Sequence, residues 1–492
     1  MSRIPTGLQS RIMSAEQAAA LITSGMTLGM SGFTLVGYPK AIPGALAASG
    51  HAKNLTLCTG ASVGDDMDGV MARAGIISRR YSYQSNKSTR TLINEGSIGY
   101  IDMHLSHVPA FVNRQMGGIH IDAAVIECAA ITENGLIPAA SMGASDAFVR
   151  VADKVIVELN ETIPLDIIGM HDVFEIGLPP NAKPIPIVHP LDRVGLNYIP
   201  CPPEKIAAIV VTQLKDKSPA FTEPNEISRV IGGHIIDFLK SEVSAGRLPQ
   251  NLLPLQSGVG SVANAVLQAF ADSGFRGLTM YTETFQDSAL DLLDQGVVLG
   301  ATTCAVSFSE AAQERFYGNL AAYREKLVLR SQELSNNPEL IRRLGLVSMN
   351  TPIEVDIYGN VNSTHVAGSA VMNGIGGSGD FTRNASLNIF ATESVGKKGA
   401  ISCIVPMASH VDHTEHDTQI IVTEQGVADL RWKTPLERAE LLIENCSHPD
   451  YRPMLRSYLE QAKKTAKSQH TPHDLSQALS WHQRFLETGS MK

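Results

Sequence analysis

The segment Gln256-Ser-Gly-Val-Gly260 has the residue types that bind an anion through backbone N–H groups. It opens a predicted helix in which the apolar residues Val262, Val266 and Phe270 follow helical spacing. Consecutive N–H groups at such a helix start can hold an anion or a developing oxyanion. The alternative is a plain tight turn with no ligand.

An acidic side chain follows the next apolar run. Glu283 lies in Met280-Tyr-Thr-Glu-Thr-Phe-Gln-Asp287, after the strand-like run GLTMY and before the helical pattern ALDLLDQG. A carboxylate at the C-terminal end of a parallel strand points into the crevice where α/β proteins bind ligands. Its structural alternative is to cap the following helix.

These two segments together also fit a different class of enzyme. Gly258-x-Gly260-x-x-Ala263 matches a dinucleotide fingerprint, and Glu283 lies about 20 residues further on, where a ribose-binding acid is expected. A nicotinamide-dependent dehydrogenase is therefore an alternative, which absence of NAD(H) binding would exclude.

A third segment is rich in glycine. It runs through Asp356-Ile-Tyr-Gly-Asn-Val-Asn-Ser-Thr-His365 and continues into Met372-Asn-Gly-Ile-Gly-Gly-Ser-Gly-Asp-Phe381. Four glycines within six positions let the backbone approach a bulky ligand closely. The chain has no Gly-x-x-x-x-Gly-Lys-Ser/Thr motif, which excludes a nucleoside triphosphate P-loop.

A histidine-rich segment suggests a metal-dependent hydrolase as a further alternative. In Ser409-His-Val-Asp-His-Thr-Glu-His-Asp417, His410, His413 and His416 recur every three residues, with Asp412 and Glu415 between them and Asp417 directly after. Histidines at i and i+3 of a helix could share a zinc ion. However, the segment lies between two apparent strands and lacks His-Glu-x-x-His, so we predict no metal site.

The elements that would position these side chains indicate an α/β protein. Short apolar runs without alternation are typical of strands buried on both faces, and they include NLTLCTG, IDAAVIECAAIT, DKVIVELN and KIAAIVVTQ. Ser14-Ala-Glu-Gln17 predicts a capping box for a helix that Gly25 closes. Helical stretches between the runs imply βαβ units and mostly parallel sheets.

A change of character at residues 214–226 marks a domain boundary. This polar stretch contains two prolines and precedes the amphipathic ISRVIGGHIIDFLKSEV. We therefore predict an α/β domain over 1–215 and a second over 222–492, with a helical C-terminal cap from Thr434 onward. A chain of 492 residues is long enough for two or three cores.

Composition narrows the functional classes. With 43% hydrophobic residues and a net charge of −9, the chain resembles an ordinary globular enzyme, and no polybasic block suggests nucleic-acid or anionic-membrane binding. Its six cysteines are scattered and are expected to be reduced. No apolar run reaches the roughly 18 residues of a membrane helix, and the N-terminus lacks the apolar core of a secretory signal. We expect a cytoplasmic location, or the mitochondrial matrix in a eukaryote.

Five motifs in register carry a family resemblance. QSGVG, YTETFQD, YGNVNSTH, MNGIGGSGDF and VTEQGVADLR, in this order and spacing, resemble the acetyl-CoA hydrolase/transferase branch of the class I CoA-transferases. The similarity runs from SGFTLVGYPK to ALSWHQRF, over nearly the whole chain. It implies two related open α/β CoA-transferase domains, with the active site between them and contributed mainly by the second.

The resemblance implies that Glu283 is the nucleophile of a CoA-transferase acting on small acids such as acetate and succinate. The glutamate would attack an acyl-CoA to give an acyl-glutamyl anhydride and then a glutamyl-CoA thioester, in a ping-pong reaction. Net acyl-CoA hydrolysis is the close alternative. The resemblance implies no tightly bound cofactor, coenzyme A as a substrate, and a homodimer.

Site residues follow from the resemblance position by position. The amides of Val259 and Gly377 would form an oxyanion hole, Glu424 would be a second active-site acid, and Ser62 and Asn336 would lie near the small-acid pocket. The residues expected to line the CoA site are Gly258, Val259, Gly260, Ser261, Val262, Ile353, Asn373, Gly377 and Lys397. Structural alternatives remain for Ser62 (a helix cap), Asn336 (a turn residue) and Lys397 (a solvated lysine). His365 stands where some relatives carry arginine, and we assign it no catalytic role.

Overall fold

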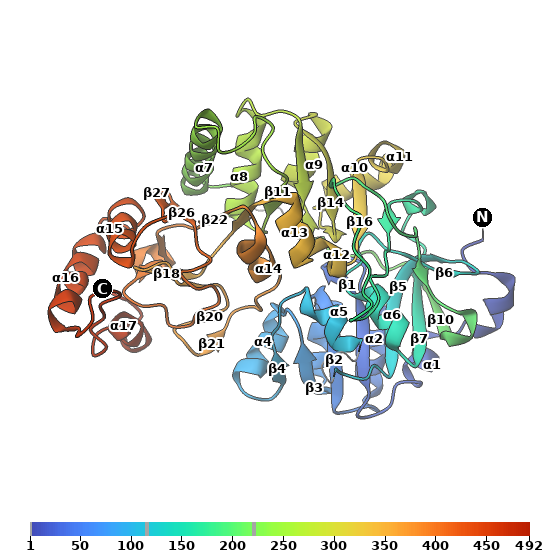
Figure 1. Cartoon of the computed structure of the whole chain (residues 1–492). Helices are drawn as coiled ribbons and strands as arrows, with labels where there is room; N and C mark the ends of the chain where they lie inside the picture. Colours follow the sequence, from blue (N-terminus) through green and yellow to red (C-terminus); the bar gives the residue numbers. More distant parts are fainter. Residues whose placement is uncertain (1, 114–117, 219–222) are drawn as a thin grey trace. The chain divides into compact units, whose positions relative to one another are not determined.

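The computed structural model describes residues 2–113, 118–218 and 223–492 (Figure 1). The chain forms two compact units, each made of three segments. Unit 1 comprises Met1–Phe221, Thr279–Leu290 and Leu299–Leu344, and unit 2 comprises Thr222–Leu278, Asp291–Val298 and Gly345–Lys492. This division differs from the two consecutive ranges 1–215 and 222–492, because two segments of the second half belong to unit 1.

Strand pairing explains why these later segments belong to unit 1. Strand β16 (Leu327–Arg330) pairs in parallel with β8 (His171–Asp172), and Ala305 forms an isolated bridge with Ser141. Both contacts join residues more than 150 positions apart. Periodicity along a sequence carries no information about such long-range pairs, so it could not place the segments.

The main sheet of unit 1 is parallel along its length. Its strands lie in the order β10-β7-β5-β1-β2-β3-β4, and every pair along this path is parallel. Their bounds are β1 (Thr27–Thr34), β2 (Leu55–Ser62), β3 (Ile77–Tyr81), β4 (Gly99–Ile101), β5 (Ala123–Ile131), β7 (Lys154–Asn160) and β10 (Ile206–Thr212). The antiparallel β6 (Gly135–Pro138) and β9 (Ile199–Pro200) lie off this path. The four apolar runs predicted as strands here are β2, β5, β7 and β10.

Helices cover this sheet and bury its apolar side chains. They are α1 (Ala15–Ala19), α2 (Ala41–Ser49), α3 (Val70–Arg73), α4 (Lys87–Asn94), α5 (His107–Val112) and α6 (Ser145–Val151). The Ser14 and Gln17 side chains form the predicted reciprocal capping box. The helix after them ends at Ala19, earlier than predicted, and Gly25 supplies a turn with φ 83° further on. One core cluster joins α1, α2 and α3 to β1 and β2.

Four more strands follow one another in the order β12, β14, β16, β8, in which β8 comes from the first segment of unit 1 and the others from its later part. Their new bounds are β12 (Leu278–Tyr281) and β14 (Val298–Thr303), and the short pair β13 (Thr284–Phe285) and β15 (Ala305–Val306) runs parallel. The helices are α9 (Asp287–Asp294), α10 (Glu310–Gly318), α11 (Leu320–Tyr323), α12 (Gln332–Ser335) and α13 (Pro338–Leu344). These elements bring Glu283 and Asn336 into the same unit.

Unit 2 has a sheet in the order β27-β26-β22-β17-β11. Its strands are β11 (Leu255–Ser257), β17 (Val347–Asn350), β22 (Leu387–Ala391), β26 (Ile420–Thr423) and β27 (Gly426–Asp429). All pairs are parallel except the edge hairpin β26–β27. Helices α7 (Glu226–Ser244), α8 (Ser261–Ala271) and α14 (Ser378–Asn384) belong to the same unit.

The C-terminal part of unit 2 is helical, as predicted. Helices α15 (Pro435–Asn445), α16 (Arg452–Thr465) and α17 (Ser480–Thr488), red in Figure 1, pack with the small sheet β18 (Glu354–Asp356), β19 (Val361–Asn362) and β25 (Ile404–Val405). The α/β class, the mostly parallel sheets and the helical end are therefore confirmed. Across the described ranges, no helix has both the length and the apolar character needed to cross a membrane.

Candidate active site

Glu283 lies in the tight connection between β12 and β13, where neighbouring strands fix its backbone. Its carbonyl oxygen accepts hydrogen bonds from the amides of Cys304 and Ala305, at 3.0 and 3.1 Å. The Thr303 hydroxyl lies 3.1 Å from the same oxygen. The β14–β15 segment therefore fixes the backbone from which the Glu283 side chain extends. The next helix, α9, begins only at Asp287.

The Glu283 carboxylate is held by Asn336. Asn336 follows α12, is fully buried, and donates from Nδ2 to Glu283 Oε2 at 2.8 Å. Its Oδ1 accepts a hydrogen bond from the Ser335 hydroxyl at 2.8 Å. Since a carboxylate only accepts, the Ser335 bond orients the amide so that its NH₂ group faces Glu283. The Tyr281 hydroxyl donates to the Leu334 carbonyl at 2.7 Å and ties α12 to β12.

The turn role considered for Asn336 is filled by its neighbour Asn337. Asn337 directly precedes Pro338, and its side-chain oxygen accepts from the Glu339 amide at 3.0 Å. This contact caps the start of α13. Asn336 is thus available to Glu283, and the segment from Leu334 to Pro338 (LSNNP) contains one asparagine for each purpose.

Burial sets the electrostatics of Glu283. It raises the pKa of Glu283 to about 7, and the hydrogen bond from Asn336 opposes this rise. The residue keeps partial access to solvent. A carboxylate with this pKa changes its charge near neutral pH, and its ionised form is less hydrated than an exposed one. Both properties suit a nucleophile or a proton-exchanging group.

Two neighbours of Glu283 had no signal in the sequence. Ser335 orients the amide of Asn336, and Tyr83 lies close enough that the charge of Glu283 adds to the burial that raises the pKa of Tyr83. The contact of Tyr83 depends on tertiary placement, whereas Ser335 directly precedes Asn336 and its role follows from the local turn after α12.

Ser62 lies at the C-terminal end of β2 and has a place in the core. It is fully buried, and its hydroxyl donates to the Ser31 carbonyl at 3.1 Å. Its own carbonyl accepts a hydrogen bond from the buried Arg80 at 3.0 Å. These contacts position the strand end, and a role of Ser62 toward a small acid stays a prediction.

The predicted anion-binding turn connects β11 to α8. Gly258 donates its N–H to the Met349 carbonyl at 2.9 Å, and the Val259 side chain is 54% exposed. Gly260 has φ 112° and ψ −178°, a conformation that only glycine adopts readily. Ser261 and Val262 then open α8, which has no side-chain cap, so helix-start N–H groups remain for a ligand.

The glycine-rich segment precedes α14. Gly377 is buried directly before this helix, and its carbonyl accepts from the Phe381 amide at 3.0 Å. Asn373 donates from Nδ2 to the carbonyls of Ser363 and Gly374, at 3.0 and 2.9 Å. Ile353, at the start of the preceding segment, is partly buried. The segment therefore has a defined backbone conformation.

Glu424 and Lys397 complete the predicted set in unit 2. Glu424 accepts from the Ser394 amide at 2.8 Å, from the Ser394 hydroxyl, and from Gln425 at 3.0 Å. Burial disfavours its ionisation, but these hydrogen bonds hold the pKa of Glu424 below its usual value. Lys397 is exposed, with its ammonium 4.6 Å from the centre of the Phe485 ring.

The structure thus groups the predicted residues in two sets. Glu283, Asn336 and Ser62 belong to unit 1, and the first two form a hydrogen-bonded pair. The remaining residues belong to unit 2: Gly258, Val259, Gly260, Ser261, Val262, Ile353, Asn373, Gly377, Lys397 and Glu424.

The histidine-rich segment does not gather its imidazoles around one point. His413 is buried, lies 3.0 Å from the Ser378 hydroxyl and contacts the Phe390 ring. His410 stacks on His365 with ring centres 3.9 Å apart. In the part of the chain that the structure describes, the one His/carboxylate group spaced for a metal ion is His120, Asp122 and Asp153. The metal-hydrolase alternative therefore has no support in this segment.

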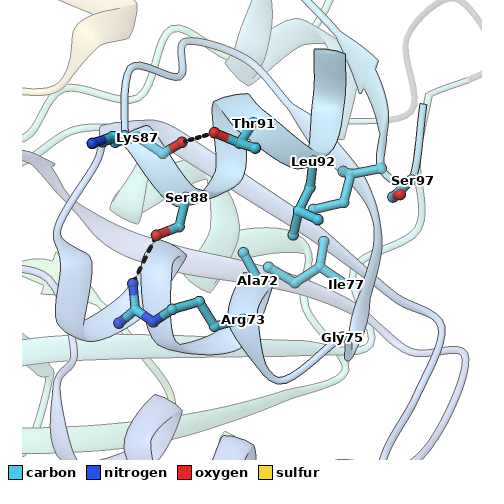
Figure 2. A pocket seen from close by; sticks show the side chains of 10 residues that line it. Ala72, Arg73, Gly75, Ile77, Lys87, Ser88, Thr91, Leu92 and Ser97 are labelled. Carbon is cyan, nitrogen blue, oxygen red and sulfur yellow. Dashed lines mark hydrogen bonds between the residues drawn. The ribbon is translucent and has the colours of Figure 1, made fainter. Parts of the chain in front are cut away.

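A separate cavity of about 770 Å³ in unit 1 contains none of the predicted site residues (Figure 2). It lies beside α3 and α4, and Arg73 on its wall is engaged by the Ser88 hydroxyl and by Asp65. The cavity therefore adds no group to the Glu283 site.

Local chain order does not exclude a dinucleotide enzyme. β11, α8 and β12 follow one another as strand, helix and strand, and Glu283 comes directly after β12. Comparison with known proteins separates the alternatives.

Solved structures share the fold. The chain matches RipA from Yersinia pestis with a TM-score of 0.69 and 21% identity, over 92% of this chain and 97% of that one. It matches a 4-hydroxybutyrate CoA-transferase from Porphyromonas gingivalis with a TM-score of 0.61 and 20% identity, over 92% and 98%. The chain has the fold found in these proteins.

Sequence models and relatives establish the family. Residues 6–211 match the acetyl-CoA hydrolase/transferase N-terminal domain, and residues 313–459 match the corresponding C-terminal domain. A succinyl-CoA:acetate CoA-transferase of Clostridium kluyveri is 53% identical over 99% of this chain and 91% of its own length. An acetyl-CoA hydrolase of Schizosaccharomyces pombe is 45% identical, over 99% of both chains. The chain belongs to the acetyl-CoA hydrolase/transferase family and is an enzyme.

Proposed function

We propose that this enzyme transfers coenzyme A between an acyl-CoA and a small carboxylate, with succinyl-CoA and acetate as its substrates. The similarity to the transferase of C. kluyveri supports this choice of acids. The observation that carries the proposal is Glu283 itself, which is partly exposed, anchored at its backbone, held by Asn336 and shifted to a pKa of about 7.

The reaction begins with attack by ionised Glu283 on the thioester carbonyl of the acyl-CoA. The carbon–sulfur bond breaks, CoA leaves as a thiolate, and an acyl-glutamyl anhydride forms. The thiolate then attacks the glutamyl carbonyl, which releases the first acid as a carboxylate and leaves a glutamyl-CoA thioester. The second carboxylate reverses these steps, so no external base, metal or redox group is needed.

Asn336 acts on Glu283 in two ways in this proposal. Its NH₂ group fixes the reacting oxygen atoms, which limits the orientations available to the nucleophile. It also stabilises the ionised form against burial, so part of the enzyme carries a reactive carboxylate at neutral pH.

The unit 2 residues would serve the rest of the substrate. The amides of Val259 and Gly377 would stabilise the oxyanion of each tetrahedral intermediate. The Gly258–Val262 turn, Ile353, Asn373 and Lys397 would bind coenzyme A, which acts as a substrate and not as a tightly bound cofactor. Ionised Glu424 would keep the arriving carboxylate in its own subsite by repulsion.

Net hydrolysis is the second candidate. The S. pombe relative, 45% identical, is named an acetyl-CoA hydrolase. In that reaction water would intercept the anhydride or the thioester. The difference lies in whether water reaches the intermediates before the second carboxylate does.

One assay separates the two candidates. Purified enzyme is incubated with succinyl-CoA, with and without acetate, and acetyl-CoA, succinate and free CoA are quantified by chromatography. A transferase gives equal amounts of acetyl-CoA and succinate with little free CoA. Free CoA that accumulates without acetate would favour the hydrolase.

The covalent step has its own test. Intact-protein mass spectrometry of enzyme treated with acyl-CoA should show a gain equal to CoA minus water, and peptide mapping should place it on Glu283. Glu283→Ala should lose the adduct and the activity while still binding CoA. An adduct that persists in this variant would exclude Glu283 as the nucleophile.

We further propose a homodimer in the cytoplasm, or in the mitochondrial matrix if the source is eukaryotic. The family resemblance supports the dimer, and sedimentation velocity of the purified protein would test it.

A further inference from the structure

A short hairpin in unit 2 has a strained turn. β23 (Val395–Gly396) pairs with β24 (Ile401–Ser402), and residues 397–400 connect them. Lys397 and Lys398 have φ 46° and 56°, and Gly399 follows with φ 87°. Residues other than glycine rarely adopt this left-handed conformation, and surrounding contacts must hold them there.

Two residues of the C-terminal segment 451–491 supply those contacts. The buried Tyr451 donates its hydroxyl to the Gly399 carbonyl at 2.9 Å, and the buried Met491 donates its amide to the Ala400 carbonyl at 2.8 Å. Two hydrogen bonds from separate parts of the C-terminal segment thus end on neighbouring residues of one turn. The turn takes its shape from these contacts and not from its own backbone preference.

Phe485 on α17 supports the side chain of Lys397. The Lys397 ammonium lies 4.6 Å from the centre of the ring, within the range of a cation–π contact. The ring itself is fixed, since Phe485 packs against the C-terminal core. A free lysine side chain samples many rotamers, and a ring that limits them reduces the entropy lost when the ammonium meets an anion.

We propose that Phe485 is a positioning residue of the coenzyme A site, which holds the Lys397 ammonium ready for a phosphate group of the acyl-CoA. This inference rests on the proposed function. One face of the ammonium lies against the ring, and its three N–H donors leave room for phosphate oxygens on the other side. The strained turn fixes the backbone of Lys397, and Phe485 fixes its end.

The first test removes the ring and keeps the apolar volume. Phe485→Leu and Phe485→Met should each raise KM for the acyl-CoA about two- to ten-fold, the cost of ordering one long side chain when the ligand binds. Neither change should alter kcat or KM for the carboxylate. Phe485→Tyr should restore KM, because it returns an aromatic face. Leu486→Ala, at the exposed neighbouring position of α17, is the matched control and should behave as wild type.

A double-mutant cycle separates positioning from packing. In a Lys397→Ala background, Phe485→Leu should produce no further rise in KM, because the ring then has no ammonium to hold. A rise of equal size in both backgrounds would overturn the proposal. Melting temperatures of all variants identify any loss that comes from α17 itself.

The outcomes also distinguish this inference from the proposed function. If wild-type enzyme neither binds CoA by calorimetry nor exchanges it, the proposed function fails. If wild type exchanges CoA and the Phe485 variants keep its KM, the inference alone fails and the function stands.

Discussion

At the scale of single residues, the direction of one amide decides the state of Glu283. The Ser335 hydroxyl bonds to Asn336 Oδ1, which leaves Nδ2 for Glu283 Oε2. If the amide were reversed, an oxygen atom would face the carboxylate and repel its ionised form. The contact therefore tunes charge as well as position, and its removal should change how the activity depends on pH.

Replacing Asn336 by alanine tests this tuning. The nucleophile must be ionised, so kcat/KM should rise with pH through the pKa of Glu283, which is about 7. Because the bond from Asn336 lowers that pKa, Asn336→Ala should move the midpoint about one to two pH units higher. Asn337→Ala is the control, since its side chain caps α13. An unchanged midpoint with a uniform loss of rate would contradict the tuning role.

The same carboxyl group should also affect stability. Activity needs its ionised form, whereas the folded state is stabilised by its protonated form. In the unfolded chain Glu283 loses its proton near 4.5, whereas in the folded chain it holds it up to about 7. Between these values the native state binds more protons, so its contribution to the free energy of unfolding falls as pH rises. Glu283→Gln does not titrate and should gain about 1–3 kcal/mol over wild type between pH 4.5 and 8.

Urea unfolding of both proteins at several pH values measures this gain. The difference between the two free energies of unfolding should grow as pH rises from 4.5 to about 7 and should stay constant at higher pH. A constant difference at all pH values would mean that burial does not shift the pKa of Glu283.

Only some of the residues around Glu283 could be predicted from the sequence. Glu283 could be selected because one of the motifs in register contains it, and Asn336 because it matches a family position. The structure places the two in hydrogen-bond contact. Tyr83 could not be selected, since its role comes from a neighbour distant in the chain, and Ser335 could not, since its role depends on the rotamer that its hydroxyl bond gives Asn336. The structural alternative for Ser62 was a helix cap, whereas its hydroxyl bonds to the carbonyl of Ser31 on an adjacent strand.

At the scale of elements, the turn between β11 and α8 uses its two glycines for different reasons. Gly260 has φ 112°, and a Cβ added there would meet no atom within 4 Å. Gly258 has no positive φ, and a Cβ there would lie 3.6 Å from the Met349 carbonyl oxygen, an ordinary contact. The backbone requires glycine at 260, and only a ligand would require it at 258.

A pair of alanine substitutions separates these requirements. Gly260→Ala should cost about 1–3 kcal/mol of stability, because alanine is strained at this φ and ψ. Gly258→Ala should leave the melting temperature near that of wild type. A loss of acyl-CoA affinity in the stable Gly258→Ala protein would then come from the added methyl group at the ligand. Equal losses of stability in both variants would contradict the assignment.

Strands could be predicted from the sequence where a short stretch of residues alone indicates that they are buried. The runs that became β2, β5, β7 and β10 are mostly apolar and almost continuously buried, and β7 and β10 are rich in β-branched residues, which suits strands buried on both faces. The helix after Ser14 was predicted too long, since alanines continue the pattern beyond Ala19 while the chain turns toward β1. Apolar composition alone does not mark where a helix stops.

At the scale of the whole molecule, the two units are interleaved along the chain. The chain passes from one unit to the other five times, at residues 221, 278, 290, 298 and 344. The segment Thr279–Leu290, which carries Glu283, is joined at both ends to segments of unit 2. This arrangement could not be predicted from composition or periodicity, because it depends on which distant strands pair.

Interleaving predicts that the chain unfolds in one cooperative transition. Separate domains often unfold independently, but here loss of unit 2 would release both ends of the Glu283 segment and destabilise unit 1.

The two tryptophans, Trp432 and Trp481, both lie in unit 2, with Trp432 99% exposed and Trp481 buried. In a Trp432→Phe variant, fluorescence therefore follows the core of unit 2, while far-ultraviolet circular dichroism follows both units. The two signals should give superimposable urea curves with one midpoint. A fluorescence transition well separated from a second circular-dichroism transition would show that unit 1 survives alone, and that crossings of the chain do not couple the units.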